Sequence, residues 1–516
     1  MPNVKKITSL AVLVFLLFLT ACGNGDNQAN GGAENAPSED LLQLPEERLP
    51  PEDNLRLSRD ELLYDFDYMM QIMEDIFPYF GLVERRLGVD IRVLAGDVRD
   101  MITYYPDSFR EFADEIGIAL ADMPPLCEHV FWSILRTELF AHIAPPGHTG
   151  ILHHGLFQLL RPFYDRDVSA EDAPLDYVNR QAFRNPASRD FYEAQGIFFD
   201  ELSEEHGVFF EAMFAEHPAL LRVLLGIEPA PEDMPPTTPT STMTMEILEE
   251  GRIAYLSIPS FAQPNLRNPG NALMRFYREI QDFEHLIIDI RNNGGGRTDF
   301  WRMLILYPLW VDRDAMPNMP LYAFYTDSDL GRLLGEAHIR TEAGASRYRS
   351  ETEHLLSSSE IMETSSLPYL NPEDLRNLGY GIRFNTSLGN IEEGHFRREG
   401  VTVEPVPFRG QIWLLTNERN FSAASLFARH AKYMDFAILV GEPTGGGYTS
   451  TVVTSFVLPH TGVILRLDID YLTDQYGRLL EEFPTTPHYA NRPGLDALET
   501  VLQMIAYLSF YDGTSR

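Results

Sequence analysis

The sequence predicts a mixed α/β protein in which a helical N-terminal region precedes an α/β core. Before about residue 230, apolar residues recur at helical spacing; after it, short apolar strands alternate with amphipathic helices. A Pro- and Thr-rich stretch separates the two patterns. We therefore expect a helical region over 55–230, a linker over 231–242 and the α/β core over 243–516.

The N-terminal residues read as a targeting segment. Lys5 and Lys6 precede an apolar run, Ile7–Phe18, that is too short for a stable membrane-spanning helix. The run ends in Leu19-Thr20-Ala21-Cys22, which resembles the bacterial lipobox, whose cysteine is acylated. We expect 1–21 to be a lipoprotein signal peptide and Cys22 to be the lipidation site. An ordinary signal peptide with a chance cysteine is the alternative.

Residues 22–54 are predicted to be a flexible tether, because Gly, Asn, Ala and Glu dominate their first half without apolar periodicity. Acyl chains on Cys22 would then hold the protein at the cell envelope, on the outer face of the bacterial membrane, with its body extracytoplasmic. The sequence has no other stretch of about 18 apolar residues, the minimum for a spanning helix.

The charge balance excludes one class of partner. The chain has 41 basic and 76 acidic residues, for a net charge of −35, so it would repel phosphate backbones and we expect no nucleic-acid binding. Lysine occurs only at Lys5, Lys6 and Lys432, and every other basic residue is arginine. The two cysteines, Cys22 and Cys127, cannot form a disulfide framework or a four-cysteine metal site.

The helical region begins after Ser58, a candidate N-cap, and ends before a loop. The apolar residues of its first helix recur at helical spacing: Leu62, Phe66, Met69, Met70, Ile72, Met73 and Ile76. Pro145, Pro146 and Gly147 stop the helices that follow, and His148-Thr149-Gly150 lies in the loop.

The core combines predicted strands and helices. The strands are 253–258, 285–290, 411–416, 436–440, 451–457 and 463–469. The helices are 271–281, 298–309, 422–434 and 495–508. Residues 317–407 fit this alternation poorly, because they are polar and broken by Gly, Pro and Ser. We interpret them as an insertion that could overhang a cleft and gate substrate.

No nucleotide or metal site is predicted. Residues 441–448 lack the Lys-Ser/Thr of a P-loop, 294–299 lack the third glycine of a dinucleotide fingerprint, and 147–150 match neither. A metal cluster from His142, His148 and the pair His153-His154 is conceivable, but adjacent loop histidines are more often solvent-exposed. We expect no cofactor.

Ser422 is the candidate nucleophile. It follows the strand 411–416 and opens a helix, whose free N–H groups favour developing negative charge. A plain N-cap is the alternative from spacing alone. Asn420 and Ala424 occupy the glycine positions of a Gly-x-Ser-x-Gly elbow, so that motif is absent.

Three segments in order together resemble the C-terminal-processing (tail-specific) and tricorn-core serine peptidases: His285–Gly296, Trp413–Ala428 and Leu439–Gly447. The similarity covers about 243–493, and the helices ending in Gly147-His148-Thr149 resemble those preceding the core in members without a PDZ domain. The resemblance implies a crotonase-like (ClpP/crotonase) core and acyl transfer through serine.

Carried over by position, Ser422 matches the nucleophile. The N–H of Ala423, with one from Gly295 or Gly296, would form the oxyanion hole. Processing peptidases of the family use a lysine base after the nucleophile helix, where this chain has Gly447. Because Lys432 lies in that helix itself, a Ser–Lys dyad is excluded.

The tricorn-like branch uses a histidine base, and His148 matches it. The branch also places a glutamate before a late turn. Glu481 matches it best, with Glu482 as a neighbouring alternative, and its role would be to orient the base. Two departures stand out: Pro484 replaces the turn glycine, and Gly147 stands where tricorn has a serine.

These observations predict a membrane-tethered, exported serine peptidase that acts on peptides or unfolded polypeptides. Its main alternative is a catalytically inactive family member that binds peptides or hydrophobic ligands at the cell envelope. Hydrolysis of a non-peptide ester or amide is a third possibility.

Overall fold

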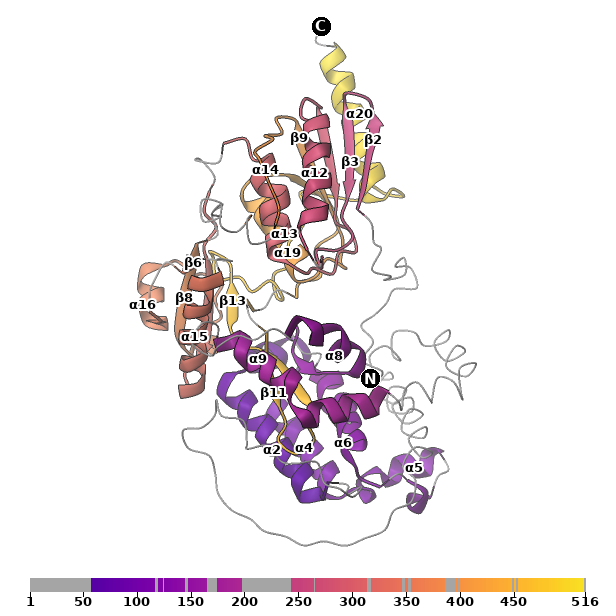
Figure 1. The fold of residues 1–516 in the computed structure, drawn as a ribbon, viewed down its shortest axis with the longest axis vertical. Coiled ribbons are helices and arrows are strands. Elements are labelled where there is room, and N and C mark those ends of the chain that lie inside the picture. The colour runs from indigo at the N-terminus through magenta and orange to yellow at the C-terminus, as the bar shows by residue number, and fades with distance from the viewer. Residues whose placement is uncertain are drawn as a thin grey trace. The chain divides into compact units, whose positions relative to one another are not determined.

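The computed structural model describes residues 57–514 apart from 117–118, 124, 144–146, 165–173, 197–242, 264, 313–316, 346–348, 351–353, 386–395, 397–399, 448–449 and 452. The chain divides into two compact units (Figure 1). The first holds 1–231, 328–330 and 452–469, and the second holds the remainder. The expected signal peptide, tether and linker, and with them Cys22, lie outside the described residues.

A six-stranded sheet forms the centre of the second unit, with the strand order β14-β10-β9-β4-β3-β2. The strands from β14 to β3 are parallel, and β2 is antiparallel to β3. Their bounds are β2 Thr244–Glu249, β3 Ile253–Ser257, β4 His285–Asp289, β9 Gln411–Thr416, β10 Ile438–Gly441 and β14 Tyr489–Ala490.

Both faces of this sheet are covered, which explains why β4 and β9 are continuous apolar runs. Leu286 and Ile288 of β4 belong to the cluster beneath one set of helices, whereas Ile287 packs with Val501 and Ile505 of α20. The first set comprises α12 Arg267–Glu279, α13 Thr298–Trp301, the π-helical η5 Arg302–Leu306, α14 Tyr307–Leu309 and α19 Ala423–Tyr433. Helix α20 spans Ala497–Thr514.

The stretch 317–407 is not merely polar: it builds a second sheet within the same unit. The strand order is β13-β5-β8-β6, with β7 also paired to β8. Every residue of β5 is buried, because the sheet packs against its own helices and continues into the core cluster. The elements are β5 Leu321–Thr326, α15 Asp329–Ala345, β6 Arg349–Ser350, β7 Leu356–Ser357, α16 Ser358–Thr364, α17 Pro372–Leu375, β8 Leu378–Asn385 and β13 Tyr471–Thr473.

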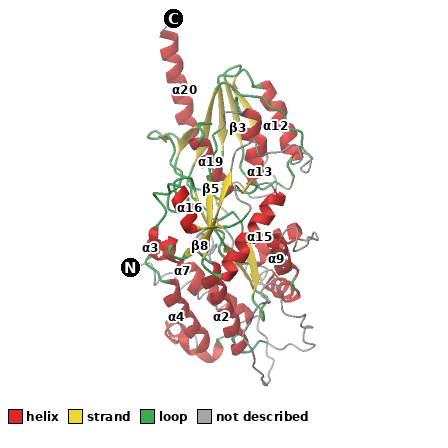
Figure 2. Cartoon of the chain, turned by 90° about the vertical axis from the view of Figure 1, so that its left-hand side faces the viewer, coloured by secondary structure: helices red, strands yellow, loops and turns green. Residues whose placement is uncertain are grey.

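The first unit is largely helical, as Figure 2 shows around α2 and α4. Its α-helices are α2 Arg59–Ile76, α3 Phe80–Leu87, α4 Ile91–Thr103, α5 Arg110–Ile116, α6 Glu128–Ile134, α7 Ala141–Ile143, α8 His154–Leu160 and α9 Pro174–Arg184, with a further helix over 186–196. Shorter turns are η1 Asp107–Phe109, η2 Leu120–Asp122, the π-helical η3 Leu135–Phe140 and η4 Arg161–Tyr164. As expected, Ser58 caps α2, in a capping box with Glu61.

One strand pair departs from the sequence expectation. Strands β11 Val453–Val457 and β12 Ile464–Asp468 form a sheet with β1 Gly150–Ile151 and belong to the first unit. The turn between them is fixed there by the buried Asp65 of α2, whose carboxylate accepts the backbone N–H groups of His460 and Thr461. Strand periodicity carries no information about this partner.

The predicted mixed α/β class with a helical N-terminal region is confirmed. Strand 411–416 is predicted to the residue, and 253–258 and 285–290 each exceed the observed strand by one residue. Within the described residues, none of the helices has the length and apolar character needed to span a membrane.

Burial of His430 makes stability depend on pH. The side chain is 1% exposed on α19, and burial, with the charges of Arg302 and Arg429, lowers its pKa to about 3. An unfolded histidine titrates near ~6.5, so unfolding takes up a proton below that pH. The stabilisation is therefore complete above about pH 6.5 and is lost as the pH falls toward 3.

We predict that the free energy of unfolding of the wild type falls between pH 6.5 and 4.5 by about 2 kcal/mol more than that of His430→Phe. Urea denaturation followed by tryptophan fluorescence measures both, because the Trp301 ring packs against that of His430 with centroids 5.0 Å apart. Identical pH dependence in the two proteins would contradict a neutral, buried His430.

Candidate active site

Ser422 occupies a strained turn between β9 and α19. Its backbone angles are φ 54° and ψ −125°, and although it stands at the N-cap position its side chain makes no capping hydrogen bond. Ser422 therefore occupies the N-cap position without the side-chain hydrogen bond that a capping serine makes. A non-glycine residue in such a conformation costs about 1–3 kcal/mol and persists only where its surroundings enforce it.

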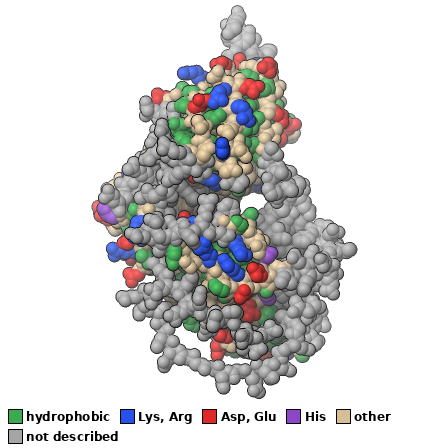
Figure 3. All heavy atoms as spheres, in the orientation of Figure 1, with side chains coloured by type: hydrophobic (Ala, Val, Ile, Leu, Met, Phe, Trp, Pro, Cys, Tyr) green, Lys and Arg blue, Asp and Glu red, His purple; other side chains and the backbone are tan. Residues whose placement is uncertain are grey.

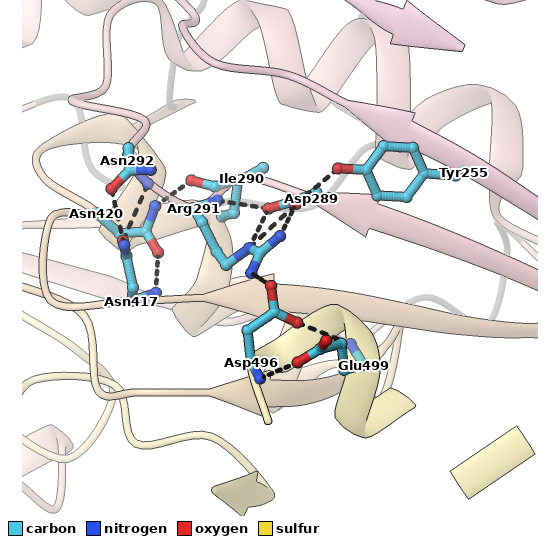
Figure 4. Close-up of polar contacts among 9 residues, drawn as sticks. All are labelled: Tyr255, Asp289, Ile290, Arg291, Asn292, Asn417, Asn420, Asp496 and Glu499. Atoms are coloured by element: carbon cyan, nitrogen blue, oxygen red, sulfur yellow. Dashed lines mark hydrogen bonds and ion pairs between the residues drawn. The ribbon is translucent and has the colours of Figure 1, made fainter. Parts of the chain in front are cut away.

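One buried and two half-buried asparagines brace the turn (Figure 4). Asn420, fully buried, donates from Nδ2 to the carbonyl of Ile290, directly after β4, and its Oδ1 accepts the N–H of Asn417. Asn417 in turn exchanges two hydrogen bonds of 2.9 and 3.0 Å with Asn292. The end of β4 and the loop after β9 are thus joined by side-chain amides.

Asn293 connects the glycine segment 294–296 to the same turn. Its fully buried side chain donates to the carbonyl of Ile258 at 2.9 Å and accepts the N–H of Gly295 at 2.8 Å. Its backbone carbonyl accepts the N–H of Phe421, the residue before Ser422. Asn293 therefore connects the residue after β3, the glycine segment and the turn at Ser422.

A charged group fixes the same edge of the sheet (Figure 4). Arg291 binds Asp289, at the end of β4, with contacts of 2.7–3.1 Å, and Asp496 at 2.9 Å, just before α20. Tyr255 donates to Asp289 at 2.8 Å. Burial and the neighbouring Asp289 raise the pKa of Tyr255 to about 12, so the phenol keeps its proton.

Glycine is required at position 295, where the segment after β4 meets the turn at Ser422. A Cβ on Gly295 would lie 2.8 Å from Ser422 Cβ and 3.0 Å from the nitrogen of Ala423, and the φ of Gly295 is +102°. The predicted oxyanion residues Gly295 and Ala423 therefore adjoin Ser422. A Cβ on Gly296 would instead meet the backbone of Phe261 and Ala262, at 2.2–2.7 Å.

The loop after β10 closes the other side of the turn. The carbonyl of Gly446 accepts the N–H of Ser422 at 3.0 Å, and Glu481 Oε2 accepts the N–H of Gly447 at 2.9 Å. A Cβ on Gly447 would lie 1.9 Å from the ring of Phe421, and its φ is +73°. The position that holds the lysine base in processing peptidases therefore has no room for a side chain here.

Lys432 stands far along α19 from Ser422. Ten residues of helix correspond to about 15 Å, and its ammonium donates to Thr486 O at 2.7 Å and to Thr486 Oγ1 at 3.3 Å. This position agrees with the exclusion of a Ser–Lys dyad.

A buried ion pair, missed by the sequence analysis, ties the nucleophile helix to the segment that carries Glu481. Arg429 of α19 binds Asp474 at 2.7 Å and also donates to the carbonyl of Phe483. Asp474 is 1% exposed. In the sequence, an acidic residue beside a turn looks the same whether it forms a buried ion pair or is exposed to solvent.

His148 lies in the first unit, beside a carboxylate that the sequence analysis did not select. Its Nδ1 is 3.6 Å from Oδ1 of Asp468, and its backbone N–H donates to Oδ2 at 3.0 Å. Asp468 ends β12 and is fully buried, while the His148 side chain is 26% exposed. The sequence signal for Asp468 was that an acidic residue lies in the mostly apolar predicted strand 463–469.

The neighbouring histidines have structural roles. His153 caps α8 by accepting the N–H of Leu156, and burial lowers its pKa to about 4. His154 bonds through Nδ1 to the carbonyl of Tyr192 at 2.7 Å. The described residues include no group of three or more His, Cys, Asp or Glu side chains arranged to hold a metal ion.

Comparison with known proteins gives one family match. Residues 252–490 match the family model described as "Peptidase family S41". Curated protein sequences give no match.

Solved structures give weaker likenesses. The photosystem II D1 C-terminal processing protease is 16% identical with a TM-score of 0.27, covering 47% of this chain and 43% of that one. Mature CPAF complexed with lactacystin is 13% identical with a TM-score of 0.42, covering 84% and 94%. A lipoprotein from Streptococcus agalactiae is 12% identical with a TM-score of 0.39, covering 89% and 99%. At these values the likenesses establish neither activity nor substrate.

We predict that Asn293→Ala lowers the free energy of unfolding by about 3 kcal/mol, because it leaves the Ile258 carbonyl and the Gly295 N–H without their partner. Asn268→Ala, at an exposed position of α12, is the control and should change stability by less than about 0.5 kcal/mol. Urea denaturation compares them, and equal stability of the two variants would contradict the assigned role of Asn293.

Proposed function

Through residues 252–490 the chain belongs to peptidase family S41 and is a serine-type peptidase, and we propose that it cleaves peptides or unfolded polypeptides through an acyl-enzyme on Ser422. One observation carries the assignment of the nucleophile. Ser422 is held in a strained turn, its side chain does not cap its helix, and Gly295 and the Ala423 nitrogen adjoin it. Stored backbone strain of this kind concentrates at functional sites.

The proposed oxyanion hole uses the N–H of Ala423 and one from the glycine segment. Ala423 is the first residue of α19, so its N–H belongs to the free end of a helix, which favours the negative charge of a tetrahedral intermediate. The N–H of Gly295 already donates to Asn293, which favours Gly296 as the second donor. The role of Gly295 is then steric, because the absence of a side chain lets the backbone of the glycine segment approach that of Ser422 and Ala423.

The proposed general base is His148. An imidazole can remove the proton of a serine hydroxyl near neutral pH, and the position of Gly447 excludes the alternative lysine. Asp468 supports this role because it lies beside Nδ1, where a carboxylate fixes the tautomer that leaves Nε2 to act on the serine. We propose Asp468 as the residue that positions His148.

Glu481 remains the residue that the resemblance assigns to orient the base. Its contact with Gly447 supports a second contribution. By holding Gly447, Glu481 fixes the loop whose Gly446 carbonyl binds the N–H of Ser422. Loss of this carboxylate would therefore loosen the nucleophile turn itself.

We further propose that the catalytic region has a crotonase-like fold and that an acylated Cys22 tethers an exported protein to the membrane. The parallel order of β3, β4, β9 and β10, with helices on both faces, supports the first proposal. The lipobox-like Leu19–Cys22 supports the second. Incorporation of labelled palmitate by cells, abolished in Cys22→Ala, would test the tether.

A fluorophosphonate probe tests the catalytic proposal. We predict labelling of wild-type protein at Ser422, detected by mass spectrometry, and none in Ser422→Ala or His148→Ala. Asp468→Asn should be labelled about 100-fold more slowly or worse, because the imidazole loses its orientation. Arg332→Gln, a substitution on the exposed part of α15, is a control that should be labelled at the wild-type rate.

Two outcomes would contradict this account. Folded wild-type protein that is not labelled would favour the alternative, an inactive family member that binds peptides or hydrophobic ligands. Labelling that persists unchanged in His148→Ala would instead show that another group activates Ser422.

A further inference from the structure

Three exposed rings and a half-buried arginine near Glu481 form a cluster in the second unit, here named the Arg478 platform: Tyr369, Tyr476, Arg478 and Phe483. The guanidinium carbon of Arg478 lies 4.2 Å from the ring centre of Tyr369 and 5.1 Å from that of Tyr476. Tyr369 also meets Phe483 edge-on at 5.6 Å. The three rings are 36–45% exposed and lie together, and a contiguous group of exposed rings is more informative than one exposed ring alone.

Buried contacts hold the platform rigid. The carboxylate of Asp474 accepts the backbone N–H groups of Tyr476 and Arg478 at 2.9 and 3.0 Å, and is itself paired with Arg429. The N–H of Tyr369 donates to the carbonyl of Tyr476 at 3.0 Å. These bonds fix the backbone that carries the side chains, and stacking on two rings restrains the guanidinium, so binding a ligand would cost it less conformational entropy.

The platform is positively charged within a strongly acidic protein. Among the described residues, no carboxylate lies within 4.0 Å of the Arg478 guanidinium or of the Lys432 ammonium. Burial, then the charges of Arg429 and Arg478, lowers the pKa of Lys432, which places these cations near one another. On the face seen in Figure 3, basic and acidic side chains are interspersed over the described surface. A guanidinium over aromatic rings, with a second cation nearby, complements a carboxylate attached to an apolar chain.

A short path connects the platform to the nucleophile. Arg478 precedes Glu481 by three residues, a span of at most about 11 Å, and Phe483 follows it by two. Glu481 holds Gly447, and Gly446 holds the N–H of Ser422. The platform therefore lies on the segment that holds the loop beside Ser422.

We propose that the Arg478 platform binds an acidic side chain of the polypeptide substrate, with its rings contacting the neighbouring residues. This inference rests on the proposed function, and it adds a preference for acidic segments to that function. Arg478 would be a specificity determinant, because it would contact the substrate away from the bond that is cleaved.

Binding tests the platform independently of catalysis. The ligands are two fluorescein-labelled, C-terminally amidated peptides of about ten residues, one with glutamates at two positions and a twin with glutamines. Fluorescence anisotropy with Ser422→Ala protein should show tighter binding of the glutamate peptide by about tenfold. Arg478→Gln in the same background should remove this preference, and Arg478→Glu should favour a lysine twin.

Catalysis tests the consequence. With internally quenched versions of the two peptides, Arg478→Gln should lower kcat/KM about tenfold for the glutamate peptide, mainly through KM, and leave the glutamine peptide unchanged. Arg332→Gln is the matched control, because that arginine also stacks on a tyrosine, Tyr380 at 5.9 Å, but pairs with Glu336. It should not change the preference.

The outcomes separate the two proposals. Equal binding of the glutamate and glutamine peptides, or an equal loss for both in Arg478→Gln, would overturn the platform. A preference that appears only with a free C-terminal carboxylate, and not with amidated peptides, would overturn the assignment to an acidic side chain. Peptide binding with this preference but no hydrolysis by the wild type would overturn the proposed function and leave the platform standing.

Discussion

The buried amide of Asn293 is the interaction on which the rest of the candidate site depends. It joins the end of β3, the N–H of Gly295 and, through its backbone carbonyl, the N–H of Phe421. A conformation as strained as that of Ser422 is stable only when its neighbours leave no alternative. The amide contacts of Asn293, with those of Asn420, supply that restraint from a sheet whose two faces are buried.

The same close packing leaves no room for a side chain at Gly447. The ring of Phe421 fills the space that a side chain at Gly447 would need, and Glu481 holds the Gly447 backbone from the other side. A lysine at this position would have to displace the Phe421 ring. The body of the chain has no lysine apart from Lys432, and the loop beside Ser422 has no room for a side chain at Gly447, so we propose His148, which lies beside Asp468, as the base.

Much of the fold could be predicted from the sequence, because local pattern determines it. Strand β9 is a continuous apolar run before a helix, and its observed bounds equal the predicted ones. The assignment of β12 to the first unit depends on Asp65, almost 400 residues away, and periodicity cannot report such a contact. For the same reason, spacing and resemblance selected Ser422 and His148, but neither selected Asp468 or Arg429, whose roles come from tertiary partners. The sheet that residues 317–407 form together with β13 could not be predicted, because this stretch of sequence is polar and interrupted, although β5 is entirely buried.

The central claim is that Ser422 is activated without a lysine, and the substitution Lys432→Arg tests it most directly. Arginine keeps the charge and can still donate to the Thr486 carbonyl, but it cannot lose a proton to act as a base. Peptide hydrolysis by Lys432→Arg, measured over a range of pH with the fold checked by circular dichroism, is predicted to equal that of the wild type. Loss of hydrolysis to the level of Ser422→Ala in a folded protein would contradict the account.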